Sequence, residues 1–153
     1  MSEIIHPASE ESPGFLLWQV STLWSNSTAA VLKAVGLTHP QFVILATIDL
    51  FKGKASQVEI ERHVVLDPKP ASHLIRSLEV KGLIELSHKE KSKYHLTTAG
   101  AEMLAKALPV VKNSDAVFFA SIDPKNSKMI TTFQKLASVN LSKKEGKSLR
   151  ENL

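Results

Sequence analysis

The sequence predicts a mainly α-helical fold that contains one small β-hairpin. Along most of the chain, apolar residues recur at intervals of three and four positions, which is the spacing of amphipathic helices. Directly after Gly82 the interval changes to two, and a charged segment at residues 89–93 separates two short apolar runs, as in a hairpin. Of the 153 residues, 43% are hydrophobic and 22% are charged, so the chain can form one domain with a buried core.

The best-defined helix is predicted between Asp67 and Gly82. Asp67 is expected to cap the first turn through its side chain, the prolines at 68 and 70 fit that turn, and Gly82 fits the left-handed position after the last turn. One face carries an apolar stripe of Ala71, Leu74, Ile75 and Leu78. The opposite face carries hydrogen-bond donors and no carboxylate: Lys69, Ser72, His73 and Arg76. Such a helix fits the major groove of DNA, although an ordinary surface helix with a solvated face has the same pattern.

Two longer helices are predicted before it, after an acidic arm at residues 1–13 that is expected to be flexible. The first runs from Phe15 to about Val35 and is apolar on more than one side. It therefore needs two packing partners, one of which another subunit can supply. The second, at residues 39–52, is almost entirely apolar and opens with a capping box at 38–41, as expected for a helix in the centre of a core.

A second capping box, at residues 56–59, opens a short helix that ends at about His63. Together with the helix that begins after Asp67 it forms a helix-turn-helix, in which the second helix presents its polar face. The hairpin follows directly, with strands predicted at 83–87 and 94–96. The predicted order in this segment is therefore a helix-turn-helix followed directly by a β-hairpin.

Two more long helices complete the predicted fold. The first spans about 99–120, is capped by a threonine at 97 or 98, and is expected to kink at Pro109. The second opens with the Asp-Pro pair at 123–124 and ends at about Val139. The fold class is thus a mainly α winged helix-turn-helix flanked by long helices.

Positive charge gathers in two regions of a chain whose net charge is +4 and whose pI is about 9.3. Residues 52–95 hold nine Lys or Arg against six Asp or Glu. The tail at 140–153 is also basic, and it is expected to be frayed. This distribution favours a polyanionic partner such as double-stranded DNA.

Several classes of function are disfavoured by what the sequence lacks. It has no cysteine, which excludes disulfides and thiolate metal sites, and its six histidines include no pair four residues apart, so no metal site is predicted. We find no nucleophile with a base, no paired carboxylates and no glycine-rich phosphate loop, and therefore expect neither an enzyme nor a cofactor. With no signal peptide and no membrane-spanning apolar run in the sequence, a cytoplasmic protein is expected.

The chain resembles the MarR family of winged-helix transcriptional regulators. The resemblance lies in the segments GLTHPQFVILATI (36–48), SQVEI (56–60), LDPKPASHLIRSLEVKGLIE (66–85) and LTTAG (96–100). It implies a homodimer, joined by helices at 14–36 and 98–139, in which a winged helix-turn-helix at 37–97 binds a pseudo-palindromic site in double-stranded DNA. It further implies a repressor that a small aromatic or anionic effector releases from DNA.

The resemblance and the residue pattern together name two sets of site residues. Ser72, His73 and Arg76 are expected to contact base edges, and Lys69 and Pro70 to contact phosphate or a thymine methyl at the helix start. The remaining DNA contacts are predicted at the start of the shorter helix and along the wing: Ser56, Gln57, Lys89, Lys91 and Lys93. For the first two of these, a purely structural cap is an equal alternative. The dimer interface is predicted to include Phe15, Trp18, Phe118, Phe133 and Leu136.

Two departures from the family pattern keep an alternative open. The wing is several residues shorter than usual and carries no arginine or aspartate, and His73 stands where the family often has arginine. Arginine is the side chain favoured in a narrow minor groove, whereas lysine can still neutralise phosphate. The alternative is therefore a winged helix that serves as a protein-interaction module with weak or no specific DNA binding.

Two smaller hypotheses concern histidines and aromatic residues. If the hairpin turns on residues 91–92, then His88 and His95 lie opposite each other, where they could bind a metal or act as a proton switch. Trp18, Trp24 and the aromatic pair at 118–119 could line an effector pocket, but helical aromatics more often belong to a core or a dimer interface.

Overall fold

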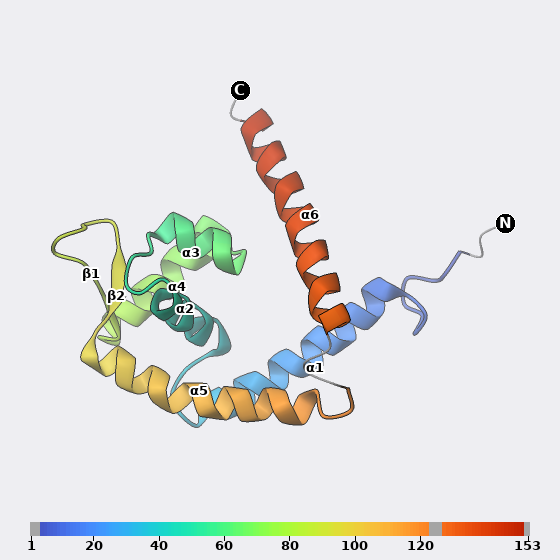
Figure 1. The fold of residues 1–153 in the computed structure, drawn as a ribbon, viewed down its shortest axis with the longest axis horizontal. Helices are drawn as coiled ribbons and strands as arrows, with labels where there is room; N and C mark the ends of the chain where they lie inside the picture. Colours follow the sequence, from blue (N-terminus) through green and yellow to red (C-terminus); the bar gives the residue numbers. More distant parts are fainter. Residues whose placement is uncertain (1–3, 123–126, 152–153) are drawn as a thin grey trace. The chain divides into compact units, whose positions relative to one another are not determined.

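The structure is a computed structural model that describes residues 4–122 and 127–151 (Figure 1). The chain divides into two compact units, residues 1–118 and residues 119–153. The elements of the first unit are α1 (Pro13–Lys33), α2 (His39–Leu50), α3 (Gln57–Val64), α4 (Pro68–Val80), β1 (Ile84–Leu86), β2 (Tyr94–Leu96) and α5 (Thr98–Phe118). The second unit contains α6 (Ser127–Glu151). The predicted fold class, a mainly helical chain with a two-stranded hairpin, is confirmed.

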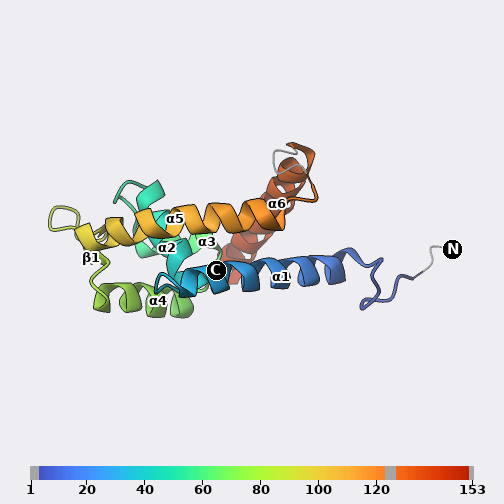
Figure 2. The same cartoon turned by 90° about the horizontal axis from the view of Figure 1, so that it is seen from below.

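Helix α2 lies at the centre of the first unit, as its apolar sequence predicts. Ile44, Leu45 and Ile48 are completely buried, and they pack with buried residues of α1, α3, α4 and α5 in one hydrophobic cluster. Both hydrogen bonds of the predicted capping box between Thr38 and Gln41 are present, so the first turn of α2 begins as expected. Helices α1 and α5 run side by side along this core (Figure 1 and Figure 2).

The two helices of the helix-turn-helix begin and end close to their predicted positions. The capping box of α3 is present, and Val65 closes α3 in the left-handed conformation with a φ of 58°. Helix α4 begins after Asp67 with prolines in its first turn, and Gly82 adopts a φ of 72° after its last turn. The Asp67 side chain, however, makes no capping hydrogen bond, so that part of the prediction is wrong. The prolines explain why α4 begins without it, because proline supplies the helical φ and removes N–H groups that would need a partner.

The wing is a short antiparallel hairpin in which Glu85 pairs with His95 and Leu86 pairs with Tyr94. The backbone N–H of Ser87 donates to the Lys93 carbonyl at 2.8 Å, which extends the same pairing toward the tip. His95 therefore lies opposite Glu85, and its Nε2 is 3.0 Å from a Glu85 carboxylate oxygen. The prediction that His88 lies opposite His95 is wrong, because the hairpin turns earlier than residues 91–92. This register removes the geometric basis for a metal site or proton switch between the two imidazoles.

The junction between the wing and α5 is a close backbone contact. The Thr97 hydroxyl accepts from the Gly100 N–H at 3.0 Å, so Thr97 is the residue that caps α5, and it donates to the Gly82 carbonyl at 2.6 Å. A Cβ atom on Gly100 would lie 1.9 Å from the carbonyl oxygen of Leu83. The first turn of α5 can therefore lie against the start of β1 only because residue 100 is glycine. Helix α5 then continues through Pro109.

Helix α6 is longer than predicted. It begins at Ser127, and it continues to Glu151 instead of ending at about Val139, so the prediction of a frayed tail is wrong. The apolar pattern ends near Val139, but the following residues are mainly Lys, Ser, Leu and Glu without proline, and their helix propensity is sufficient to continue the helix. The predicted cap at Asp123 and Pro124 lies outside the described residues.

Candidate nucleic-acid interface

The predicted recognition face of α4 is exposed in the structure. Lys69, Ser72, His73 and Arg76 all lie on the solvent side of the helix. The opposite stripe anchors the helix: Ala71 and Leu78 are completely buried and Ile75 is 2% exposed. The backbone of α4 is thus held by the core while its hydrogen-bond donors remain available to an external partner.

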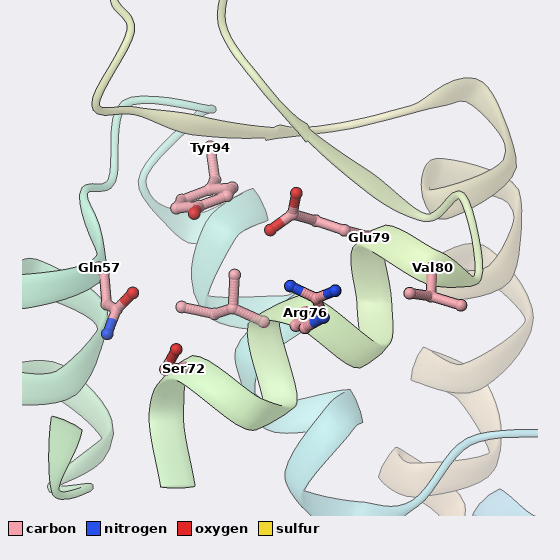
Figure 3. Close-up of a pocket in the computed structure, with 7 residues that line it drawn as sticks. Gln57, Ser72, Arg76, Glu79, Val80 and Tyr94 are labelled. Atoms are coloured by element: carbon pink, nitrogen blue, oxygen red, sulfur yellow. The ribbon is translucent and has the colours of Figure 1, made fainter. Parts of the chain in front are cut away.

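An open pocket lies where α4 meets α3 and β2. Ser72, Arg76 and Glu79 of α4 face it together with Gln57 of α3 and Tyr94 of β2 (Figure 3). Burial and the negative charge of Glu79 raise the pKa of the Tyr94 hydroxyl, so Tyr94 stays a neutral donor. Glu79 lies one turn beyond Arg76 and faces the same pocket, so the prediction that this face of the helix carries no carboxylate is wrong at its C-terminal end. Two predicted base contacts, Ser72 and Arg76, are therefore brought together with Gln57.

A hydrogen-bond network around buried Gln41 holds α4 in place. The Gln41 Oε1 accepts from the Thr38 N–H at 3.1 Å and from the Lys81 ammonium at 3.2 Å, and its Nε2 donates to the Ser77 hydroxyl at 3.1 Å. Lys81 also donates to the Gly36 carbonyl at 3.1 Å. Sequence analysis identified Gln41 only as part of a capping box. The residues that these hydrogen bonds join, Gln41 with Ser77 and with Lys81, are about one quarter of the chain apart in sequence. No local pattern of residues predicts such bonds.

The start of α3 is occupied by its own cap. The Ser56 hydroxyl accepts from the Glu59 N–H at 3.3 Å, and the Ser56 N–H donates to the Glu59 carboxylate at 2.7 Å. The Gln57 amide donates to Glu61 at 2.8 Å. The backbone hydrogen bond from Ser56, followed by the bond from Lys93, lowers the pKa of Glu59 to about 2. These contacts support the structural alternative for Ser56, while a phosphate contact at Ser56 or Gln57 stays a prediction.

The three wing lysines occupy different environments. Lys89 and Lys91 are exposed near the tip of the hairpin. Lys93 is half-buried, and its ammonium lies 2.9 Å from the Glu59 carboxylate. Only the first two therefore present their charge fully to an approaching phosphate backbone.

The residues predicted for a dimer interface lie on three helices. Phe15 and Trp18 lie on α1, where Phe15 is half-buried and Trp18 is 71% exposed. Phe118 is half-buried at the end of α5, and Phe133 and Leu136 are exposed on α6. Large exposed apolar side chains on helices are a feature of association surfaces, and the assignment stays a prediction.

Trp24 differs from Trp18, because its side chain is bound within the first unit. The indole Nε1 of Trp24 donates to Asp115 of α5 at 2.8 Å, and its ring lies edge-on to the His39 ring at 5.0 Å between centroids. The Ser25 hydroxyl lies 3.3 Å from His39 Nδ1. Burial lowers the pKa of His39, and the charge of Asp115 opposes that shift. Of the two readings for the helical aromatics, these contacts support internal packing for Trp24.

Neither a metal-ion cluster nor a membrane-spanning helix is present in the described residues. Residues 4–122 and 127–151 contain no group of three or more His, Asp or Glu side chains that could hold a metal ion. No helix in the same part of the chain has the length and apolar character needed to cross a membrane.

Comparison with known proteins places this interface among DNA-binding regulators. The profile of the MarR family matches residues 37–93, which cover α2, α3, α4 and most of the wing. The chain is 35% identical over 117 residues to an uncharacterized HTH-type transcriptional regulator, YdcH of Bacillus subtilis, a match that covers 72% of this chain and 80% of the relative.

Solved structures give the same result. The MarR family protein Rv2887 of Mycobacterium tuberculosis, an HTH-type transcriptional repressor, was solved in complex with DNA; it matches with a TM-score of 0.67 and 26% identity over 83% of this chain and 98% of that one. The same protein in complex with p-aminosalicylic acid matches with a TM-score of 0.65 and 28% identity over 81% of this chain and 97% of that one.

These relatives favour DNA binding over the protein-interaction alternative, and MarR regulators are not enzymes as a kind. The exposed donor face of α4, the hairpin beside it and the long flanking helices are the parts that such a regulator requires. This chain belongs to the MarR family, and it is a winged-helix, DNA-binding transcriptional regulator.

Proposed function

We propose that this regulator binds a pseudo-palindromic operator as a homodimer and represses transcription until a small aromatic or anionic effector releases it. The observation that carries the proposal is α4, whose exposed donor face is backed by an apolar stripe anchored by buried Ala71, Ile75 and Leu78. A helix held in this way can enter the major groove without rearranging its core.

Within α4 we assign two kinds of contact. Ser72, His73 and Arg76 reach base edges, because they lie on the exposed face beyond the first turn. Lys69 and Pro70 lie in the first turn, where they contact phosphate or a thymine methyl. Arg76 makes the most specific contact of this set, since a guanidinium can donate two hydrogen bonds to one guanine.

The phosphate contacts outside α4 come from the wing tip and the start of α3. Lys89 and Lys91 are exposed, and lysine acts on phosphate as a point charge that does not need a defined geometry. Gln57 lies at the N-terminal end of α3, whose dipole also favours an anion, whereas the N–H and hydroxyl of Ser56 are bound to Glu59, so Ser56 is the weaker candidate of the two. The wing thus anchors the protein on the backbone without reading bases in the minor groove.

The homodimer rests on apolar side chains that the described chain does not cover. On α1, Leu17, Trp18 and Leu23 are between 58% and 71% exposed, and on α6, Phe133 and Leu136 are slightly more than half exposed. Two copies that cover these side chains would remove a large apolar area from water. The dimer would also present two α4 helices to successive major grooves.

The effector class follows from a relative. Rv2887 was solved with p-aminosalicylic acid and with salicylic acid, which are small aromatic anions. We propose that an effector of the same class acts on this chain. We also propose that the regulator itself works in the cytoplasm, where it binds the chromosome. No resident cofactor is proposed.

Selection of bound duplexes from a random-sequence DNA pool at near-physiological salt tests the function. We expect an enriched pseudo-palindrome whose half-sites lie about one helical turn apart. Retention of DNA without enrichment would show that only the phosphate backbone is bound, and it would overturn the proposal of a specific operator. A second measurement adds salicylate to the enriched complex, where the expected result is a lower affinity.

A further inference from the structure

We propose that Lys93 is a positioning residue for DNA binding: paired with Glu59, it fixes the wing against α3 instead of contacting phosphate. The proposal deepens the proposed function and rests on it, because it divides the wing lysines into two groups. Lys89 and Lys91 touch DNA, whereas Lys93 determines where the wing that carries them is held. Three contacts of the wing support it: two with residues 53–55, which precede α3, and one with Glu59 inside α3.

The first two contacts are made before α3 begins. The Tyr94 N–H donates to the Ala55 carbonyl at 2.9 Å, and the two residues form an isolated antiparallel bridge. Two residues earlier, a Cβ atom on Gly53 would lie 2.8 Å from the Cβ of His95. The strand β2 therefore lies against residues 53–55 almost as a neighbouring strand would, directly before α3 begins.

The third contact is the ion pair itself. One oxygen of Glu59, Oε2, accepts from the Ser56 N–H at 2.7 Å and from the Lys93 ammonium at 2.9 Å. The same carboxylate therefore completes the cap of α3 and binds the wing. Because its pKa is about 2, Glu59 is ionised throughout the physiological range, and the pair persists there.

The charge balance argues against a phosphate contact by Lys93. Its side chain is 26% exposed, and the negative charge of Glu59 lies within hydrogen-bond distance. A phosphate would have to compete with that carboxylate while being repelled by it. Lys89 and Lys91 are exposed, and they belong to the same hairpin, which makes Lys91 a matched control for Lys93.

Substitutions at Glu59 and Lys93 distinguish a positioning role of Lys93 from a phosphate contact. For Glu59→Gln, the two roles predict opposite changes in DNA affinity. Glu59→Gln keeps the capping box, in which Gln replaces Glu without loss of the hydrogen bond, but it removes the ion pair. If Lys93 contacted phosphate, this variant would bind DNA more tightly, since a repulsive charge is lost and Lys93 is released. If Lys93 positions the wing, Glu59→Gln weakens binding roughly two- to fivefold, the effect expected for a partly exposed ion pair.

Binding is measured over a salt series on the duplex that selection enriches. We expect Lys93→Met to weaken binding by the same two- to fivefold and to leave the slope of log K against log salt unchanged. Lys91→Met should make that slope less steep by about 0.9, the change for one lost phosphate contact. Lys93→Arg should restore wild-type affinity because it keeps the pair. The double variant Glu59→Gln with Lys93→Met should bind no more weakly than either single variant.

Tighter binding by Glu59→Gln, or a lower salt slope for Lys93→Met, would overturn the proposal. A measurement that needs no DNA distinguishes failure of the positioning role from failure of the proposed function. Hydrogen exchange at the Tyr94 amide should accelerate in both Glu59→Gln and Lys93→Met, and should be unchanged in Lys91→Met. Unchanged exchange in the first two variants would contradict the positioning role even if no duplex were enriched, and thermal unfolding of each variant confirms that it is folded.

Discussion

Large apolar side chains are mostly buried in the winged-helix region at residues 37–97, whereas many of them are exposed on the terminal helices α1 and α6. Ile44, Leu45 and Ile60 in the winged-helix region are completely buried within a single chain. Trp18 on α1 and Phe133 on α6 are 71% and 52% exposed. The difference agrees with the proposed homodimer, in which a second chain covers the apolar side chains of the long helices while the DNA-binding region is complete within one chain.

The largest expected effect is at the junction between α5 and the winged-helix region, where Gly100 of α5 lies against Leu83. Gly100→Ala places a Cβ where the Leu83 carbonyl oxygen lies, so α5 must move away from β1. We expect a loss of about 3 kcal/mol in the free energy of unfolding, at the upper end for an overpacked site. Urea unfolding followed by tryptophan fluorescence measures it. Gly146→Ala is the control, because a Cβ there meets nothing within 4 Å, and it should leave stability unchanged or slightly raised.

The next prediction compares the two tryptophans of α1. Trp18→Ser removes an exposed side chain that we assign to the dimer, so the dimer dissociation constant should rise at least about tenfold while the monomer stays folded. Trp24→Phe instead loses the bond to Asp115 and should lower unfolding stability by about 1–2 kcal/mol with little effect on association. Sedimentation equilibrium and thermal unfolding measure the two effects. Unchanged association in Trp18→Ser would remove Trp18 from the interface.

A third variant tests how α4 is held. Gln41→Leu removes the hydrogen bonds to Thr38, Ser77 and Lys81 and should cost about 1–2 kcal/mol in unfolding stability. DNA affinity should fall as well, because α4 loses its polar attachment to α2. Gln41→Glu keeps an oxygen that accepts from Thr38 and Lys81, so its loss of unfolding stability should be smaller. Equal losses in both variants would show that the network does not position the helix.

The smallest expected effect concerns pH. The pKa of Glu59 is lowered from 4.5 to about 2 in the folded chain, so its ion pair and cap stabilise the fold above pH 4.5, and this contribution is lost as pH falls toward 2. The Tm of the wild type should exceed that of Glu59→Gln at neutral pH, and the difference should shrink below pH 4.5. Thermal unfolding at several pH values measures it, and a difference that grew on acidification would contradict the assignment.

Local signals in the sequence were sufficient to predict the elements. The capping boxes at 38–41 and 56–59, the prolines in the first turn of α4 and the glycine after its last turn are short patterns with a direct physical cause, and each marks a helix end in the structure. The buried stripe and exposed face of α4 follow from spacing alone. Prediction of the hairpin was similarly successful for its strands, since alternation of apolar residues is local too.

Features that depend on contacts between distant residues could not be predicted in this way. The position of the turn decides which residues face each other across the hairpin, so placing it at 91–92 moved His88 opposite His95. The bonds of Gln41 to α4 and of Glu59 to the wing join segments more than 30 residues apart. The end of α6 was missed for another reason, because helix propensity continued after the apolar pattern had stopped.

The affinity of wild type and Arg76→Ala for the enriched operator and for a scrambled duplex tests the central claim most directly. Arg76 lies on the exposed face of α4, which we assign to base recognition in the major groove. We predict that Arg76→Ala lowers operator affinity by about 1–3 kcal/mol and changes scrambled-duplex affinity much less, so that preference for the operator is reduced. An equal loss on both duplexes would show that Arg76 contacts only phosphate, and it would contradict recognition of the operator through this face of α4.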